Sequence, residues 1–214
     1  EGAVTIEVPL ANGTHDLVAM LSQVTERTKV IWVCNPNNPT GTIVSAEALS
    51  TFLDSVPKQV MVVLDEAYYE YVTDLSYSDG IKLIERYPNL VVLRTFSKIY
   101  GLAALRIGYG VASPAIIKLI NQVREPFNTS RVAQVAALSA LGDEDYVQEC
   151  RRLNAAGILQ LQAEFKRLDL ESFPAHGNFI MVDVRKPALD VFDALLRKGI
   201  IVRAGHRLYP SYIR

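Results

Sequence analysis

Short apolar runs that alternate with one-faced helical runs constrain the fold of this 214-residue chain more than any other feature. The runs VIWV (residues 30–33), VMVVL (60–64) and LVVLR (90–94) are apolar almost throughout, as strands covered on both faces are. Between strand-like segments, apolar residues recur three and four positions apart, which indicates amphipathic helices. Helices that alternate with strands are typical of parallel sheets. The sequence therefore predicts an α/β fold with a mostly parallel sheet.

The remaining segments divide the chain into two predicted parts. Residues 1–147 are expected to form the α/β part, and residues 148–214 a smaller α+β part joined to it by a long helix. Ser45 and Ser113 precede helical runs and are suitable N-caps, and Gly199 is suited to end a helix. The predicted strands are 3–8, 30–33, 60–64, 90–94, 106–112, 178–184, 200–203 and 211–213, and the predicted helices are 16–24, 45–55, 113–123, 130–168 with a break near Gly142, and 187–198.

Composition and charge favour a protein that acts on small molecules. Lys and Arg total 22 against 23 Asp and Glu, a net charge of -1, so the chain offers neither a basic field for nucleic acid nor a polybasic membrane patch. No apolar run is long enough to span a bilayer. Cys34 and Cys150 belong to no motif, which indicates a reducing cytoplasm and no disulfide framework. The three histidines match no ligand spacing, so we expect loop residues and no metal site: His15, His176 and His206.

Polar side chains follow three of the predicted strands at the point where each strand ends. Asp65 and Tyr68 come after VMVVL, Asn38 lies in the turn NPNNPTG after VIWV, and Lys98 follows LVVLR. In open parallel sheets, ligands bind at the carboxyl ends of the strands. The sequence therefore predicts one edge of the sheet that carries a carboxylate, a phenol, an amide and an amine.

This set of groups meets the needs of pyridoxal phosphate. That cofactor needs an amine for its aldehyde, a carboxylate to keep its ring nitrogen protonated, donors for its phenolic oxygen, and hydroxyl and guanidinium groups for its phosphate. Each residue alone has a plainer interpretation, as a strand-end acid, a packing tyrosine, a tight turn or a solvated lysine. Their order and shared edge favour the cofactor site, whose predicted residues are Lys98, Asp65, Tyr68, Asn38, Ser97 and Arg106.

Three motifs at these separations, NPNNPTG, LDEAYYEY and RTFSKIYGLAALRIGY, resemble the fold-type I, aspartate-aminotransferase-like pyridoxal phosphate enzymes. The residues of these motifs, together with the segments REPFNTS and GHRLYPSYIR, are most similar to those of the histidinol-phosphate aminotransferase subgroup. The resemblance covers essentially the whole chain. It implies a homodimer whose sites take residues from both subunits.

The resemblance also implies a role for each matching residue. Lys98 would bond the cofactor aldehyde and shuttle a proton, and Asp65 would pair with the ring nitrogen. Asn38 and Tyr68 would contact the cofactor O3′. A cis peptide bond before Pro39 would turn Asn38 toward the cofactor. The remaining roles are the cofactor phosphate for Ser97 and Arg106, and the anionic end of the substrate for Arg203 and Arg214.

The expected reaction is transamination from L-histidinol phosphate to 2-oxoglutarate in histidine biosynthesis. An aromatic amino acid aminotransferase, a lyase similar to threonine-phosphate decarboxylase, and a non-catalytic fragment are the alternatives. The phosphate loop and ring-stacking aromatic of the family normally precede VTIEVPL and are not present here. Also missing are the N-terminal arm, one family strand between the 4–8 and 30–33 strands, and the end of the small domain. The chain therefore resembles a fragment, and we expect it to be inactive when isolated.

Overall fold

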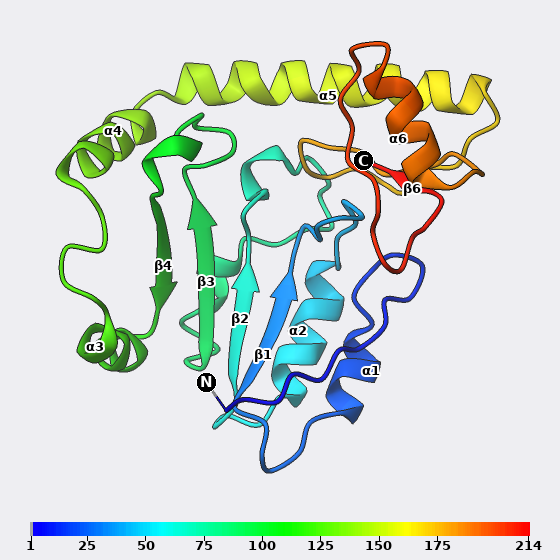
Figure 1. Ribbon diagram of the computed structural model, residues 1–214. Helices are drawn as coiled ribbons and strands as arrows, with labels where there is room; N and C mark the ends of the chain where they lie inside the picture. Colours follow the sequence, from blue (N-terminus) through cyan, green and yellow to red (C-terminus); the bar gives the residue numbers. More distant parts are fainter. Residues whose placement is uncertain (1) are drawn as a thin grey trace.

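A four-stranded sheet forms the centre of the computed structural model, which describes residues 2–214 (Figure 1). Its strands are β1 (Val30–Cys34), β2 (Met61–Asp65), β3 (Leu90–Thr95) and β4 (Gly108–Ala112), in the spatial order β1-β2-β3-β4. The first three run parallel, and β4 runs antiparallel to β3. The predicted mostly parallel α/β sheet is confirmed.

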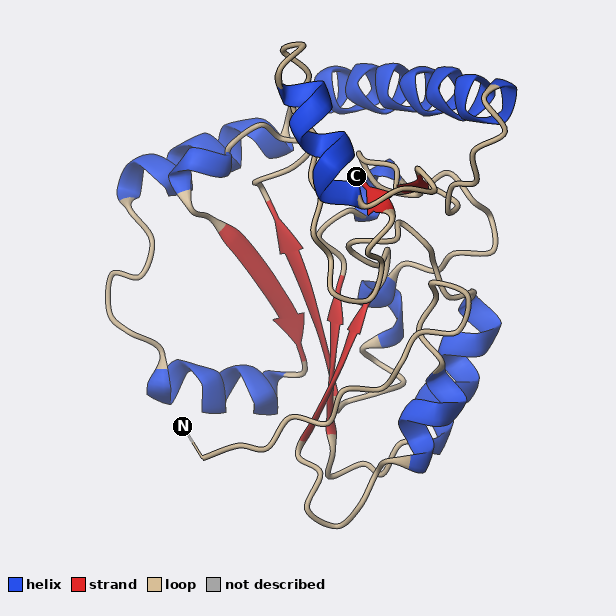
Figure 2. Ribbon diagram, turned by 45° about the vertical axis from the view of Figure 1, so that its right-hand side comes forward, coloured by secondary structure: helices blue, strands red, loops and turns tan. Residues whose placement is uncertain are grey.

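Two helices cover one face of this sheet, α1 (Leu17–Ser22) and α2 (Ala46–Ser55) (Figure 2). Ser45 caps α2 as predicted, because its side chain accepts a hydrogen bond from the Ala48 N–H at 3.2 Å. The predicted inward residues Leu49, Phe52 and Leu53 are all buried against the strands. This layer fixes which face of each strand is core, since alternate residues of a strand point to opposite faces.

A long helix, α5 (Glu144–Arg167), runs along one edge of the molecule and connects the main sheet to a smaller unit (Figure 1). The smaller unit pairs β5 (Val182–Asp183) with β6 (Tyr212–Ile213) in antiparallel fashion, and α6 (Ala188–Leu196) packs against them. The remaining elements are α3 (Pro114–Val123), α4 (Arg131–Leu141) and the short 3-10 helices η1 (Tyr69–Tyr71), η2 (Gly80–Leu83) and η3 (Ala103–Leu105). The predicted break near Gly142 is confirmed, because Gly142 is the C-cap of α4.

Three strand predictions were wrong in whole or in part. Residues 3–8 form no strand, because an alternating pattern still needs a hydrogen-bonding neighbour, and none pairs with them within residues 2–214. Residues 200–203 are also irregular, although Arg203 exchanges two backbone bonds with Arg214. The predicted strand 178–184 is reduced to the two residues of β5.

One helix-cap prediction was also wrong. Ser113 precedes α3 as expected, but its hydroxyl donates to the Pro88 carbonyl and does not cap the helix.

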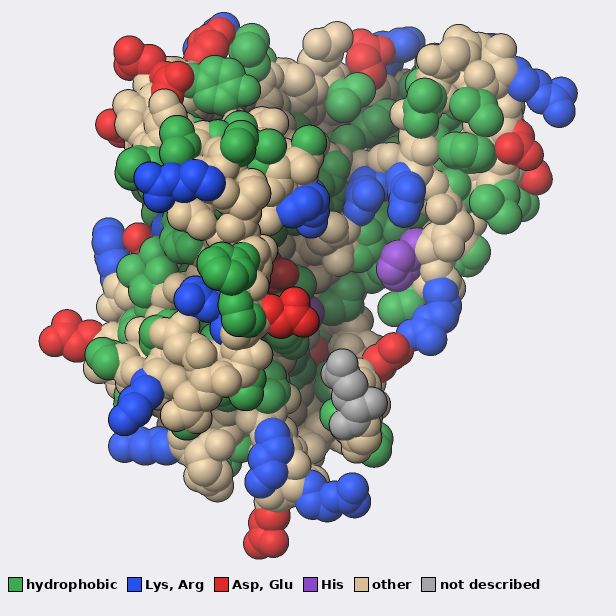
Figure 3. All heavy atoms as spheres, turned by 60° about the vertical axis from the view of Figure 1, so that its left-hand side comes forward, with side chains coloured by type: hydrophobic (Ala, Val, Ile, Leu, Met, Phe, Trp, Pro, Cys, Tyr) green, Lys and Arg blue, Asp and Glu red, His purple; other side chains and the backbone are tan. Residues whose placement is uncertain are grey.

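Helices α3 and α4 carry exposed apolar side chains, among them Leu119, Val123, Val132 and Leu138. Figure 3 turns the side of the molecule that carries these helices forward and shows hydrophobic side chains on it. Charged side chains are interspersed with them in this view. Within the described residues 2–214, no helix combines the length and the apolar character that crossing a membrane requires.

The core under α2 predicts a contrast between two truncations. Phe52 is 1% exposed, so Phe52→Ala should lower the free energy of unfolding by about 3–5 kcal/mol through lost burial and a cavity. Val18 on α1 is 79% exposed, so Val18→Ala should change it by less than about 0.5 kcal/mol. Urea unfolding followed by circular dichroism measures both. Equal midpoints for the two variants would contradict the assigned core.

Candidate active site

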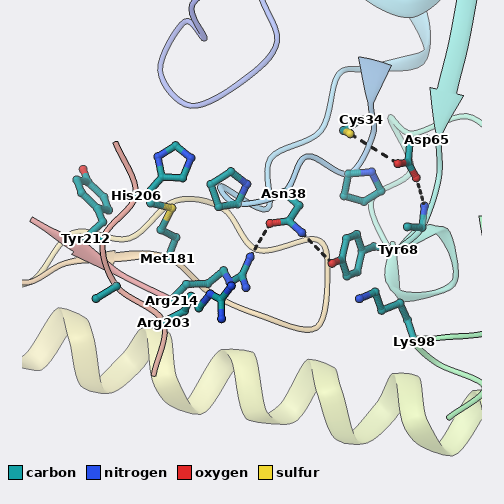
Figure 4. Close-up of a pocket in the computed structure, with 15 residues that line it drawn as sticks. Cys34, Asn38, Asp65, Tyr68, Lys98, Met181, Arg203, His206, Tyr212 and Arg214 are labelled. Atoms are coloured by element: carbon teal, nitrogen blue, oxygen red, sulfur yellow. Dashed lines mark hydrogen bonds between the residues drawn. The ribbon is translucent and has the colours of Figure 1, made fainter. Parts of the chain in front are cut away.

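A cavity of about 730 Å³ lies at the carboxyl ends of β1 and β2, and Lys98, which follows β3, also lines it (Figure 4). Register aligns Cys34, the last residue of β1, with Asp65, the last residue of β2. Both line the cavity together with Tyr68 and Lys98, which follow β2 and β3. The structure therefore brings the predicted carboxylate, phenol and amine to one edge of the sheet.

Asp65 is half-buried and turns its carboxylate toward the cavity (Figure 4). One oxygen, Oδ1, accepts a hydrogen bond from the Ala67 N–H at 3.1 Å. The other, Oδ2, lies 3.9 Å from the Cys34 thiol, a weak donor. Burial first, and the charge of Asp65 second, raise the pKa of Cys34 to about 11. The thiol therefore stays protonated at neutral pH and can donate to the carboxylate.

Asn38, Tyr68 and Lys98 are neighbours in the wall of the cavity. The Asn38 amide Nδ2 donates to the Tyr68 hydroxyl at 3.1 Å. The Lys98 Nζ lies 5.2 Å from the centroid of the Tyr68 ring. The predicted cis peptide bond before Pro39 is confirmed, and a second cis bond before Pro36 was not predicted.

Arg203 and Arg214 reach the same cavity from the smaller unit. Their backbones exchange two hydrogen bonds of 2.8 Å, so the residues are directly opposite and their side chains share a face. The Arg214 Nη1 donates to Asn38 Oδ1 at 2.5 Å, and its guanidinium carbon lies 5.2 Å from the centroid of the Phe179 ring. Two cationic side chains therefore face the amide that contacts Tyr68.

Ser97 and Arg106 do not line this cavity but an adjoining hollow of about 560 Å³. Thr95 lines the hollow too, and its Oγ1 accepts from the Ser97 N–H at 3.0 Å. Arg106 is exposed, in a left-handed conformation with φ of 52°, and donates to the Ala103 carbonyl at 2.8 Å. Asp65 and Lys98 line both hollows, so they lie between this hydroxyl–guanidinium group and the two arginines of the smaller unit.

Sequence reasoning missed the contribution of two histidines. His15 lies in a loop as predicted, but its Nε2 accepts a hydrogen bond from the Cys34 N–H at 3.2 Å and so holds the end of β1. His206 lines the main cavity beside the arginines. Spacing could not reveal either contact, because each joins residues that lie in different segments. Among residues 2–214, no group of three His, Cys, Asp or Glu side chains could hold a metal ion.

A buried ion cluster next to the site was also missed. Arg94 of β3 donates to Glu66 Oε2 at 2.9 and 2.7 Å and to Asp79 Oδ1 at 2.6 Å. Burial opposes the charge of Arg94, but the attraction and hydrogen bonds of Glu66 outweigh it and raise the pKa of Arg94 above its usual range. The sequence signal for this cluster was Arg94 at the end of the apolar run LVVLR, since a charged side chain in a buried strand is rare unless it is paired.

The chemistry of these side chains fits pyridoxal phosphate. The amine and the carboxylate line both hollows, and the amide and phenol supply hydrogen-bonding groups beside them. The smaller hollow offers hydroxyl and guanidinium groups suited to a phosphate.

Comparison with known proteins identifies the family. A family model described as "Aminotransferase class I and II" matches residues 1–214. The chain belongs to this family. The resemblance stated from the motifs is thereby confirmed.

Individual relatives are consistent with this assignment. A histidinol-phosphate aminotransferase of Brevibacillus brevis is 53% identical over 215 residues, which cover 100% of this chain and 59% of the relative. A crystal structure of histidinol-phosphate aminotransferase from Sinorhizobium meliloti in complex with pyridoxal-5'-phosphate is 32% identical, with a TM-score of 0.90 over 98% of this chain and 58% of that one. An aspartate aminotransferase mutant of Thermus thermophilus shares the fold, with a TM-score of 0.85, 21% identity, and coverage of 99% and 62%. The chain spans 59% of the length of its Brevibacillus relative.

The His15 contact predicts a pH dependence of stability. Burial lowers the pKa of His15 in the folded state, so the unfolded chain binds a proton that the folded chain resists. Stability should therefore be highest above the ordinary histidine pKa of about 6.5 and fall as the pH drops through it. His15→Gln keeps an acceptor but cannot titrate, so urea midpoints between about pH 7.5 and 5.5 should fall less in this variant. Since burial also lowers the pKa of His176, some dependence should remain. Identical slopes in both proteins would refute the assignment.

Proposed function

We propose that these residues belong to a pyridoxal-phosphate-dependent aminotransferase. It would move the amino group of L-histidinol phosphate to 2-oxoglutarate, yielding imidazole-acetol phosphate and L-glutamate in cytoplasmic histidine biosynthesis. One observation carries the proposal: Lys98 and Asp65 line two adjoining hollows, and arginine side chains suited to bind an anion line each of them. The name of the 53%-identical Brevibacillus relative supports the choice of substrate.

Residues from both hollows would hold the cofactor, with its phosphate in the smaller hollow. When bound, pyridoxal phosphate supplies an electron-accepting ring for the chemistry at the substrate α-carbon. Asp65 would keep a proton on its ring nitrogen, and Ser97 and Arg106 would bind its phosphate. Tyr68 and the second N–H of the Asn38 amide would donate to its phenolic oxygen, since the first N–H is used by Tyr68. Lys98 would hold the aldehyde carbon and, once released, take the proton from the substrate α-carbon at Nζ.

The two arginines of the smaller unit would hold the anionic end of the substrate. Guanidinium groups bind phosphate and carboxylate with similar bidentate geometry. Arg203 and Arg214 could therefore accept the phosphate of histidinol phosphate in one half-reaction and the distal carboxylate of glutamate in the other. This paired charge favours a phosphorylated donor over an uncharged aromatic amino acid. A lyase acting on an amino acid phosphate would share this anion site, and only its carbon dioxide release would separate it from the transferase.

The same proposal includes a homodimer in a reducing compartment. Both cysteines of the chain are free thiols, as expected for a cytoplasmic protein. The chain covers 59% of its Brevibacillus relative, so residues outside the matched region and from a second subunit would complete the site. A full-length chimera, in which residues 1–214 replace the matching segment of that relative, is the appropriate protein for activity tests.

Lys98 should be the residue that bonds the cofactor. Borohydride treatment of the chimera with pyridoxal phosphate should fix the cofactor to a peptide that contains TFSKIYG, as mass spectrometry would show. Lys98→Arg keeps a positive charge but should abolish labelling and transamination, because a guanidinium does not form the same bond. Lys82, in η2, does not line either hollow, and Lys82→Arg serves as the matched control. Labelling of another lysine with Lys98 unmodified would refute the assignment.

Arg214 should distinguish phosphorylated donors from uncharged ones. A hydrogen bond to a charged group contributes about 1.5–3 kcal/mol, so Arg214→Gln should lower kcat/KM for histidinol phosphate by roughly 10- to 150-fold. It should change kcat/KM for histidinol, which lacks the phosphate, much less. Arg207 pairs with Glu7 and does not line the cavity, so Arg207→Gln is the control. Equal losses for the two donors would argue against a phosphate site here, and 2-oxoglutarate-independent carbon dioxide release would favour the lyase.

A further inference from the structure

Glu66, Arg94 and Asp79 form a buried cluster next to the smaller hollow, which Arg94 also lines, and none of the three has a role in the proposed chemistry. Glu66 is 0% exposed and Arg94 is 9% exposed, so both charges are taken out of water. The Arg94 guanidinium also stacks 3.5 Å from the centroid of the Tyr69 ring. Glu66 Oε1 accepts from the Gly80 N–H at 2.8 Å, and a Cβ on Gly80 would come within 2.6 Å of that oxygen. The cluster is therefore closely packed and its charges are paired.

Stability alone is a weak reason for such a cluster. Removing two charges from water is costly, and apolar side chains of similar volume are often as stabilising as a buried ion pair. Apolar residues occupy the preceding positions on the same face, Leu64 on β2 and Val92 on β3. An ion pair at this point provides fixed geometry that apolar packing lacks, since the charge-assisted hydrogen bonds from Arg94 Nε and Nη2 to Glu66 Oε2 are directional.

The position of the cluster matches the point where backbone pairing ends. The β2–β3 ladder reaches Asp65 opposite Leu93, and the Glu66 N–H donates to the Leu93 carbonyl at 2.9 Å. The Glu66–Arg94 pair then ties the two chains together by side chains. Because alternate residues face opposite ways, Glu66 points to the core face while Asp65 points to the cavity. The Glu66–Arg94 pair therefore connects, on the core face of the sheet, the two segments that carry the carboxylate and the amine.

The cluster also reaches the other segments of the site. Stacking on Tyr69 fixes the turn that places Tyr68, whose hydroxyl accepts from Asn38. The Tyr77 hydroxyl lies 3.3 Å from Glu66 Oε1 and donates to the Asn35 carbonyl at 2.6 Å, just beyond the end of β1. All three parallel strand ends are therefore joined to one group of buried side chains.

We propose that Glu66 and Arg94 are positioning residues, which set the placement of the Asp65 carboxylate relative to the Lys98 amine. The inference rests on the proposed function for the roles of Asp65 and Lys98. Lys98 is separated from Arg94 by only three residues, and Asp65 is adjacent to Glu66, so a shift of the pair moves both groups. Displacements of about 1 Å at a reacting centre lower rates by roughly 100-fold.

The test compares Arg94→Met, Arg94→Lys and Glu66→Gln with the control Arg86→Lys. Arg86 also forms an ion pair, in which its Nη2 donates to both oxygens of Asp54 at 2.9 Å, but that pair is exposed and lines neither hollow. In the chimera, borohydride labelling at Lys98 should slow by about 10- to 100-fold in Arg94→Met. Affinity for pyridoxamine phosphate, which needs no bond to Lys98, should change less than about threefold. Arg94→Lys should recover part of the labelling rate, and the pH profile of labelling should shift in Glu66→Gln.

A purely structural role would give a different result. Folded Arg94→Met, Arg94→Lys and Glu66→Gln proteins with the unmodified labelling rate and pH profile would overturn the inference. If Arg94→Met does not fold, the other two variants decide by the same criteria. If the unmodified chimera is not labelled at Lys98, the proposed function fails while the positioning inference is still tested by amide hydrogen exchange in the chimera. Exchange at residues 66–68 and 97–99 should then quicken by about tenfold or more in Glu66→Gln and not in Arg86→Lys, and equal exchange would refute the inference.

Discussion

The register of the three parallel strands is the constraint on which the site depends. Backbone pairing aligns Cys34 with Asp65 and Asp65 with Leu93, so β1 and β2 end level and β3 continues for two more residues, to Thr95. A slip of one residue would turn Asp65 into the core and Glu66 toward the cavity, because side chains alternate along a strand. The register is enforced by burial of Val62, Leu64 and Val92, each 0% exposed, under α1 and α2. Core packing on one face therefore places the carboxylate on the other.

A second constraint connects the smaller unit to this edge of the sheet. Arg214 is the last residue of the chain described here, yet its guanidinium donates to Asn38 in the turn after β1. Arg203 lies opposite it through two backbone bonds, which keeps both guanidinium groups at one end of the cavity. Two parts of the chain therefore line the cavity: residues at the ends of β2 and β3 supply the carboxylate and the amine, and the smaller unit supplies two arginines.

Local patterns were sufficient to predict much of the fold. The cap Ser45 and the stripe of Leu49, Phe52 and Leu53 predicted α2, because helix signals are carried by neighbouring residues. The strand predicted at 3–8 failed since pairing depends on a distant partner that the pattern does not contain. The same cause explains Arg203, whose backbone pairs with Arg214 without forming a strand.

For the site, strand ends predicted that Asp65, Tyr68 and Lys98 would meet, and the structure brings them to one cavity. The cis bond before Pro39 came from family resemblance, because no local signal distinguishes it. The Glu66–Arg94 pair and the His15 contact could not be predicted from spacing, since each joins segments that only the folded sheet brings together.

A crystal structure of the chimera with pyridoxal phosphate tests the central claim most directly. The claim is that Asp65, at the end of β2, and Lys98, just after β3, contact the ring nitrogen and the aldehyde carbon of one cofactor molecule. We expect continuous density between Lys98 Nζ and the cofactor aldehyde carbon, and an Asp65 oxygen about 3 Å from the ring nitrogen. A cofactor bound with its ring nitrogen away from Asp65, or bonded to a different lysine, would contradict it.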